Sequence, residues 1–159
     1  MQKLISGDFR RVKLNQTINT SFILINKLSG KALDVPGATL NPGERIIQYE
    51  INRRFNQRWK WIKHDKGYLI QSVQSGLFLD ISGESREAGG KVIQWTRTGN
   101  PNQQWLPEAV GNGVYKIRSI HESCMFLSIK GESIDDGGKL ETNNKENPTM
   151  YWIIEGALP

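Results

Sequence analysis

Two sets of polar and aromatic residues recur at matching positions in two of the three repeats of this chain. Each set holds an aspartate, an aromatic residue fifteen positions later and an adjacent asparagine–glutamine pair. The two sets are Asp34, Tyr49, Asn56 and Gln57, and Asp80, Trp95, Asn102 and Gln103. A carboxylate accepts hydrogen bonds, an amide donates and accepts them, and an aromatic ring presents an apolar face. Together these groups offer the chemistry of ligand binding.

The third repeat lacks all of these groups. We align Ser128 with the aspartates, Thr142 with the aromatic residues and Thr149-Met150 with the amide pair. The aspartates could instead cap turns, and the aromatic residues could pack beneath loops. Residues with purely structural roles should, however, be needed in all three repeats. Their joint retention in two repeats and joint loss in one predicts two binding sites and a silent third repeat.

Catalysis has little support in the sequence. The two histidines, His64 and His121, lie in no nucleophile or metal-ligand pattern, and Cys124 replaces a turn glycine and reads as a packed thiol. Phosphate-cradling glycine motifs are also missing. We therefore expect a protein that is not an enzyme and that needs no metal and no cofactor.

The elements that must position these residues come in three copies. The phrases 29–35, 75–81 and 123–129 share one apolar pattern, and each is followed at a near-constant distance by a tryptophan: Trp59, Trp105 and Trp152. A period of about 46 residues indicates one structural unit used three times. A large indole at the same place in each unit is best explained as core packing, with its N–H bound to a nearby carbonyl.

Each repeat reads as four short strands. The first strands are expected at 22–25, 68–70 and 114–117, the second around Leu33, Leu79 and Leu127, and the third at 45–49, 91–95 and 139–142. The fourth strand carries the tryptophan. No apolar 3.6-residue period persists for ten residues, so helices should be short or absent. Propellers usually need at least four blades, so three units predict an all-β β-trefoil, in which a six-stranded barrel is capped by three hairpins.

The phrases Gln57-Arg58-Trp59 and Gln103-Gln104-Trp105, with Leu33-Asp34-Val35 and Leu79-Asp80-Ile81 upstream, resemble the ricin B-type β-trefoil lectins. The resemblance covers residues 18–155, with repeats at about 18–63, 64–110 and 111–155. Residues 1–17 would form an N-terminal extension. Its apolar residues are suited to docking on the barrel or on a second copy of the chain in a homodimer. They are Leu4, Ile5, Phe9, Val12 and Leu14.

The resemblance implies a carbohydrate-binding protein for glycans that contain galactose or N-acetylgalactosamine. In the roles it implies, Asp34 and Asp80 accept hydrogen bonds from sugar hydroxyls, and Tyr49 and Trp95 stack on the ring. Asn56 and Asn102 would bind the same hydroxyls, whereas Gln57 and Gln103 would brace the aspartates. The alternative is a trefoil that binds proteins without sugar, as a protease inhibitor, a cytoskeletal binder or a toxin-targeting component.

Charge and chain ends restrict the partners further. The net charge is +5, and the basic residues are scattered along the chain. They indicate either a solvated basic surface or an attraction to an acidic glycan, a nucleic acid or a membrane. No nucleic-acid-binding motif appears, so we expect no nucleic acid partner. No stretch approaches the ~20 apolar residues that span a bilayer, and the first residues lack the apolar core of a signal peptide. We expect no membrane insertion, and a location that is cytoplasmic, or extracellular by a route independent of a signal peptide.

Overall fold

The strands that open and close each repeat form a closed ring in the computed structural model, which describes residues 2–3 and 20–157. Antiparallel pairing runs through the ring in the order β2–β5–β6–β9–β10–β13 and returns to β2. The members are β2 (Ser21–Asn26), β5 (Trp59–His64), β6 (Gly67–Ser72), β9 (Trp105–Gly111), β10 (Val114–Ser119) and β13 (Trp152–Ala157). Closure leaves no edge strand in this barrel.

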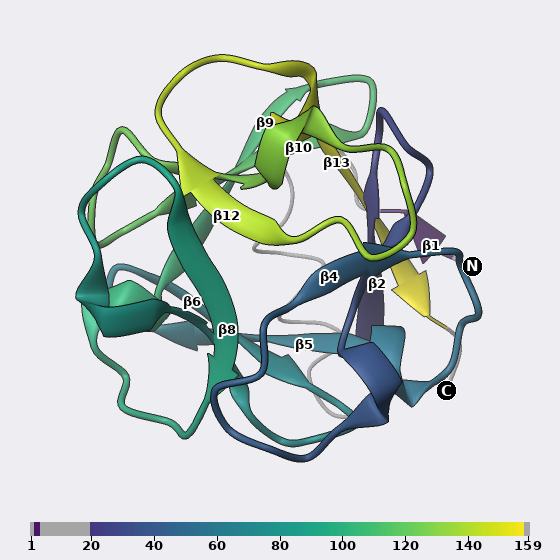
Figure 1. Cartoon of the computed structure of the whole chain (residues 1–159), viewed down its shortest axis with the longest axis horizontal. Coiled ribbons are helices and arrows are strands. Elements are labelled where there is room, and N and C mark those ends of the chain that lie inside the picture. Colours follow the sequence, from purple (N-terminus) through teal and green to yellow (C-terminus); the bar gives the residue numbers. More distant parts are fainter. Residues whose placement is uncertain (1, 4–19, 158–159) are drawn as a thin grey trace.

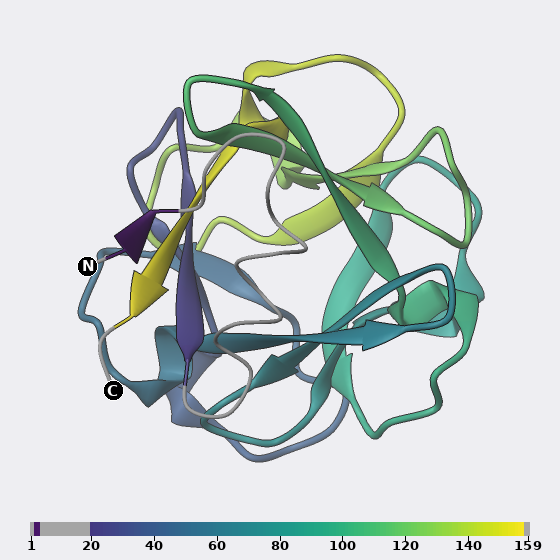
Figure 2. The same ribbon diagram turned by 180° about the vertical axis from the view of Figure 1, so that it is seen from behind.

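Three hairpins close one end of the barrel. They pair β3 (Ala32–Asp34) with β4 (Ile47–Tyr49), β7 (Phe78–Ile81) with β8 (Gly90–Trp95), and β11 (Phe126–Ile129) with β12 (Leu140–Asn143). Figure 1 looks onto this end, where β4, β8 and β12 surround the centre, and Figure 2 shows the barrel strands from behind. The predicted β-trefoil is confirmed.

The repeated tryptophans lie in the core, as predicted. Trp59, Trp105 and Trp152 are fully buried. Each indole N–H donates to the carbonyl oxygen of the leucine in its own repeat: Leu33 (3.1 Å), Leu79 (3.1 Å) and Leu127 (3.3 Å). Each tryptophan therefore ties the barrel to the hairpin that carries the candidate aspartate.

Helices are short, as the sequence predicts, and they flank the candidate residues. The 3₁₀ turns η2 (Phe55–Gln57), η4 (Pro101–Gln103) and η6 (Pro148–Met150) precede the tryptophan strands. The turns η1 (Pro36–Ala38), η3 (Ser82–Glu84) and η5 (Lys130–Glu132) follow the second strand of each repeat. In the described part of the chain, no helix has the length and apolar character needed to cross a membrane.

The two ends of the described chain meet at the barrel. A two-residue strand, β1 (Gln2–Lys3), pairs antiparallel with β13 opposite Glu155 and Gly156. The five apolar residues for which we expect docking (4, 5, 9, 12 and 14) lie outside the described residues.

Candidate functional site

The second repeat places a buried carboxylate on the side of its hairpin that faces away from the core. Leu79 and Ile81 both belong to the core cluster, so strand alternation turns Asp80 to the opposite face. Asp80 is nevertheless only 4% exposed. Gln103 braces it, since its Nε2 donates to Asp80 Oδ2 (2.8 Å) and also to the carbonyl oxygen of Thr96 (2.8 Å).

A cavity of about 380 Å³ opens beside this carboxylate. Its lining combines carboxylate, amide, hydroxyl and aromatic groups, from Asp80, Ser82, Gly83, Glu84, Ile93, Trp95, Thr98, Asn100 and Asn102. Trp95 is 41% exposed and so offers part of its ring to solvent. A loop of the first repeat supports that ring, because the Gly43 N–H donates to the Gln94 carbonyl oxygen (2.7 Å) and a Cβ on Gly43 would lie 3.6 Å from Trp95 Cζ3.

The first repeat brings its predicted residues together in a similar way. Both Gln57 Nε2 (2.8 Å) and Asn56 Nδ2 (3.1 Å) donate to Asp34 Oδ2, and Tyr49 is 45% exposed. The glutamine hydrogen bonds in both repeats agree with the bracing role that the resemblance implies.

The two asparagines do not make the same contacts. Whereas Asn56 donates to its aspartate, Asn102 Nδ2 donates to the carbonyl oxygen of Ile81 (3.2 Å). The Asn102 Oδ1 atom is buried and has no hydrogen-bond partner within the described part of the chain. A ligand donor would satisfy this oxygen, and the first repeat offers no such unpaired atom at Asn56.

Burial also sets the protonation behaviour of both aspartates. Desolvation raises the pKa of Asp34 and of Asp80 from 3.8 to about 6, and the glutamine hydrogen bonds oppose this rise in both repeats. Smaller contributions come from the negative charges of Asp136 near Asp34 and of Glu84 near Asp80. Both carboxylates are therefore mostly ionised at neutral pH and become neutral under mildly acidic conditions.

The strand register corrects one alignment in the third repeat. Asn143 lies opposite Phe126, as Trp95 lies opposite Phe78, whereas Thr142 lies opposite Leu127. Asn143, and not Thr142, therefore holds the aromatic position. The alignment was wrong because the segment from this position to the tryptophan is one residue shorter in the third repeat than in the other two.

The third repeat also has its carboxylate on a different strand. In the second repeat Asp80 pairs with Ile93 across the hairpin, and at the same position of the third repeat Ser128 pairs with Glu141. The acidic residue therefore lies on the first strand of the hairpin in the second repeat and on the second strand in the third repeat. A cavity of about 150 Å³ is lined here by Glu141, Asn143 and neighbouring residues, none of them aromatic. The stacking surface of the other repeats is therefore missing from this described lining.

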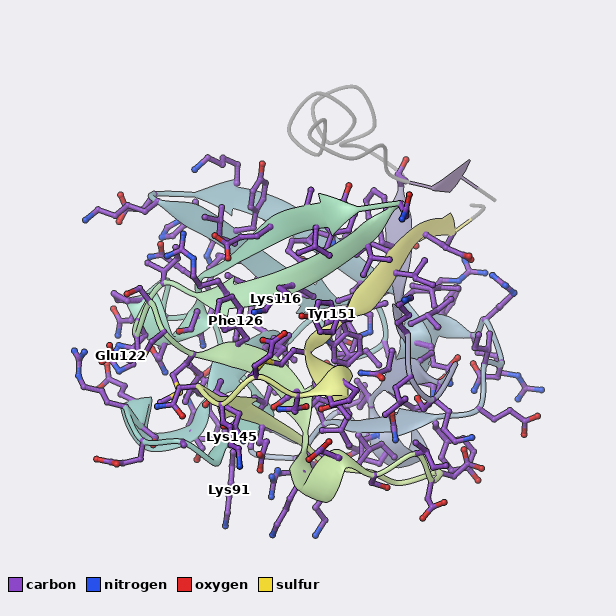
Figure 3. All side chains as sticks on the ribbon, turned by 90° about the horizontal axis from the view of Figure 1, so that it is seen from above. Lys91, Lys116, Glu122, Phe126, Lys145 and Tyr151 are labelled. Atoms are coloured by element: carbon purple, nitrogen blue, oxygen red, sulfur yellow. The ribbon has the colours of Figure 1, made fainter. Side chains whose placement is uncertain are left out.

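Two partly buried aromatic rings of the third repeat contact a lysine instead. Lys116 Nζ lies 4.2 Å from the centre of the Phe126 ring and 5.8 Å from that of Tyr151, and it donates to Glu146 Oε2 (2.9 Å). Tyr151 also donates its hydroxyl hydrogen to Glu146. Figure 3 shows Lys116, Phe126 and Tyr151 close together on this side of the molecule.

Sequence reasoning missed a larger cavity of about 620 Å³ at the junction of the first and third repeats. Its lining is Lys27, Leu28, Glu146, Asn147, Pro148 and Tyr151. None of the predicted site residues lies in it, and no sequence signal marks it, because the two segments are more than a hundred residues apart. Sequence reasoning also missed Ser82, Glu84, Thr98 and Asn100 of the second cavity. Within the described residues, no cluster of three or more histidine, cysteine or acidic side chains could hold a metal ion.

Comparison with known proteins identifies the class of this domain. The sequence model of the family described as "Ricin-type beta-trefoil lectin domain-like" matches residues 55–143, which is more than half of the chain. The chain belongs to this family. A search of curated proteins gave no match at a significant level.

Solved structures agree with this assignment. A designed threefold-symmetric protein, ThreeFoil, is 31% identical with a TM-score of 0.81, and the match covers 85% of this chain and 97% of that one. An exo-β-1,3-galactanase from Clostridium thermocellum is 33% identical with a TM-score of 0.83, and the match covers 86% of this chain but only 30% of the galactanase. The C-terminal half of an earthworm R-type lectin, solved in complex with GalNAc, is 23% identical with a TM-score of 0.66 and coverages of 86% and 98%. At that identity the earthworm lectin supports the fold alone.

Proposed function

We propose that this protein binds glycans that contain galactose or N-acetylgalactosamine, through the pockets of the first and second repeats. It acts as a binding protein without catalysis, and its third repeat serves to close the barrel. One observation carries the proposal: the buried Asp80, braced by Gln103, faces a cavity that is walled by the half-exposed ring of Trp95.

The chemistry of that cavity fits a galactose-type ring. Such a ring presents a patch of C–H groups that packs on an indole face, and its neighbouring hydroxyls need an acceptor at a fixed position beside that face. The ionised Asp80 carboxylate supplies the acceptor, and the Gln103 hydrogen bond engages only one of its two oxygens, Oδ2. The unpaired Asn102 Oδ1 supplies a second acceptor.

The names of similar proteins motivate this class of ligand, and the lectins below 25% identity share the fold. The earthworm lectin structure holds GalNAc, and a lectin from Macrolepiota procera was solved with lactose. The galactanase that contains a segment 33% identical to this chain acts on a galactose polymer by its name. A single open pocket of this kind binds a monosaccharide at around millimolar, on the order of −4 kcal/mol.

The test is direct titration of the protein with methyl galactoside and with N-acetylgalactosamine, with binding measured by NMR or by calorimetry. Two saturable sites are expected. Trp95→Ala should remove binding at the second site and Tyr49→Ala at the first, because each removes the stacking surface of one pocket. Phe55→Ala is a matched control, since Phe55 is 58% exposed and is not one of the predicted site residues. Absence of binding by either sugar, or retention of both sites in a Tyr49→Ala and Trp95→Ala double variant, would contradict the proposal.

A further inference from the structure

The residue four positions after the site aspartate differs between the two pockets. It is Ala38 in the first repeat and Glu84 in the second, and each ends the 3₁₀ turn that follows the aspartate strand. Glu84 lines the cavity of the second repeat together with Asp80. The second pocket therefore carries two carboxylates on its own repeat, and the first carries one.

The backbone holds Glu84 at this place. Its φ is +53°, in the left-handed region that non-glycine residues rarely adopt, and it follows Gly83 at φ +63°. The turn is closed by a hydrogen bond from the Ser85 N–H to the Ser82 carbonyl oxygen (3.3 Å). His121 Nε2, from the third repeat, donates to the Glu84 carbonyl oxygen (2.8 Å). The Glu84 side chain thus projects from a fixed point on the rim of the cavity.

Beside the first site, a carboxylate of the third repeat is paired with a lysine of the first repeat. Asp136 accepts a hydrogen bond from the Glu50 N–H (2.9 Å), next to Tyr49, and it pairs with Lys31 Nζ at 3.3 Å. The second pocket has neither partner. Its counterpart of Lys31 is Leu77, and the matching loop position of the repeat before it is Pro42.

Nearby cations do not offset the acidity of the second pocket. Arg86 donates to Glu122 (3.2 Å). The Arg97 guanidinium lies 5.8 Å from the centre of the Phe78 ring, and Phe78 is two residues before Asp80 on the same strand. Neither arginine is part of the described cavity lining, which contains no lysine either.

We propose that Glu84 makes the second pocket select sugars by charge, so that it favours an amine-bearing hexose and rejects an anionic one, whereas the first pocket, which has one carboxylate of its own repeat, discriminates less. This inference rests on the proposed function, because it concerns the ligand of the same pocket. A carboxylate several ångströms from a charged ligand at the protein surface changes affinity by about threefold to tenfold in each direction. Salt should weaken the effect, since exposed charges are screened.

The experiment isolates the second pocket with Tyr49→Ala and titrates three probes near pH 7.5 and at low salt. The probes are methyl galactoside, galactosamine and galacturonic acid. Galactosamine is expected to bind more tightly than galacturonic acid, and Glu84→Gln should reduce the ratio of their affinities by about threefold or more. Comparing this ratio between variants cancels any effect of the altered ring substituents themselves.

Two further variants control the interpretation. Glu87→Gln removes the same charge three residues along the loop but outside the cavity lining, and it should change the ratio less than Glu84→Gln does. Ala38→Glu, in a Trp95→Ala background that isolates the first pocket, should increase the preference for galactosamine over galacturonic acid there.

The outcomes separate this inference from the proposed function. Binding of methyl galactoside with no preference between the charged sugars, or with a preference that Glu84→Gln leaves unchanged, would overturn the inference alone. Absence of methyl galactoside binding would overturn both. A preference that persists undiminished at about 1 M salt would also count against an electrostatic origin.

Discussion

The two candidate aspartates combine burial with a proposed function that requires their charge. Asp34 and Asp80 are nearly inaccessible, yet each is held by an amide N–H that favours the ionised form. The cost of burying the charge still exceeds this stabilisation, which is why the pKa of each carboxylate rises to about 6. A carboxylate with a pKa so close to neutrality makes ligand binding sensitive to mild acid.

We predict that sugar affinity falls as the pH is lowered from about 7.5 to about 5, with a midpoint near pH 6. Protonation replaces the ionised acceptor with a weaker neutral one, and it weakens the hydrogen bond from Gln103 in the same way. The measurement is the dissociation constant of methyl galactoside as a function of pH. Asp80→Asn in the Tyr49→Ala background should bind weakly and with no transition near pH 6, and a transition that survives in that variant would refute the assignment.

The same pKa shifts affect stability in the opposite direction. Because the folded-state pKa lies above the unfolded value of about 3.8, the folded protein binds more protons than the unfolded chain between about pH 4 and pH 6. The contribution of these two groups to stability therefore falls as the pH rises through this window. A loss of binding on acidification would then not be explained by unfolding caused by these aspartates, and a thermal melt at each pH checks this point.

At the scale of elements, Gln103 connects three segments of the second repeat. Its Nε2 donates to Asp80 and to the Thr96 carbonyl oxygen, and its Oε1 accepts from the N–H groups of Thr98 (2.9 Å) and Gly99 (3.2 Å). The side chain is fully buried. The glutamine of the Gln-x-Trp motif therefore holds the 96–99 loop in place and also positions the Asp80 carboxylate.

We predict that Gln103→Ala destabilises the protein by about 2–4 kcal/mol, because it leaves several buried polar groups without partners. It should also weaken sugar binding at the second pocket, since Asp80 and the 96–99 loop lose their support. Urea unfolding and sugar titration of the same variant provide the two measurements. Gln71→Ala is a suitable control, because Gln71 makes an exposed side-chain hydrogen bond to Gly76. Equal stability of the two variants would contradict this account.

The barrel depends on close approach of strands at Gly67. A Cβ at this position would lie 2.8 Å from the Trp105 carbonyl oxygen, where β6 meets β9. We predict that Gly67→Ala costs about 1–3 kcal/mol of unfolding free energy, because backbone atoms must move to admit the methyl group. Gly113→Ala is the comparison that measures backbone strain without a steric clash, because Gly113 has φ +75° and no atom lies within 4 Å of its Cβ position. Its cost should come from strain alone, and chemical denaturation of both variants measures the two contributions.

At the scale of the whole molecule, the proposed binding sites of the first and second repeats belong to one trefoil. We predict that binding to a surface dense in galactose is stronger than binding to free sugar by about 100-fold or more, because the second contact becomes intramolecular. Tyr49→Ala and Trp95→Ala should each remove most of this gain while leaving one weak site for the free sugar. Surface plasmon resonance at several glycan densities measures the gain. If both single variants bind the dense galactose surface as strongly as the unaltered protein does, the account of two pockets that bind at once is contradicted.

Much of this architecture follows from the sequence because it is repeated. Each repeat displays local apolar alternation and one tryptophan at the same place, so the trefoil and the residues that line up within each repeat were predictable. The grouping of Asp80 with Gln103, and of Asp34 with Gln57, followed from the same register. One position of the third repeat was misaligned by one residue, because it was counted back from Trp152 across a shortened segment; the spacing of fifteen residues from Ser128 leads to Asn143, which strand pairing places opposite Phe126.

Contacts between repeats were not predictable in this way. The sequence by itself determined the threefold fold, the two retained sets of site residues and the loss of the set in the third repeat. Only the tertiary structure decided that Gly43 supports Trp95, that Asp136 of the third repeat pairs with Lys31 of the first, and that Glu84 lines the cavity of the second repeat. The physical reason is that the pattern of polar and apolar residues along the chain reflects the local conformation of each repeat. The charge at the rim of a pocket depends instead on which distant loops barrel closure brings beside it.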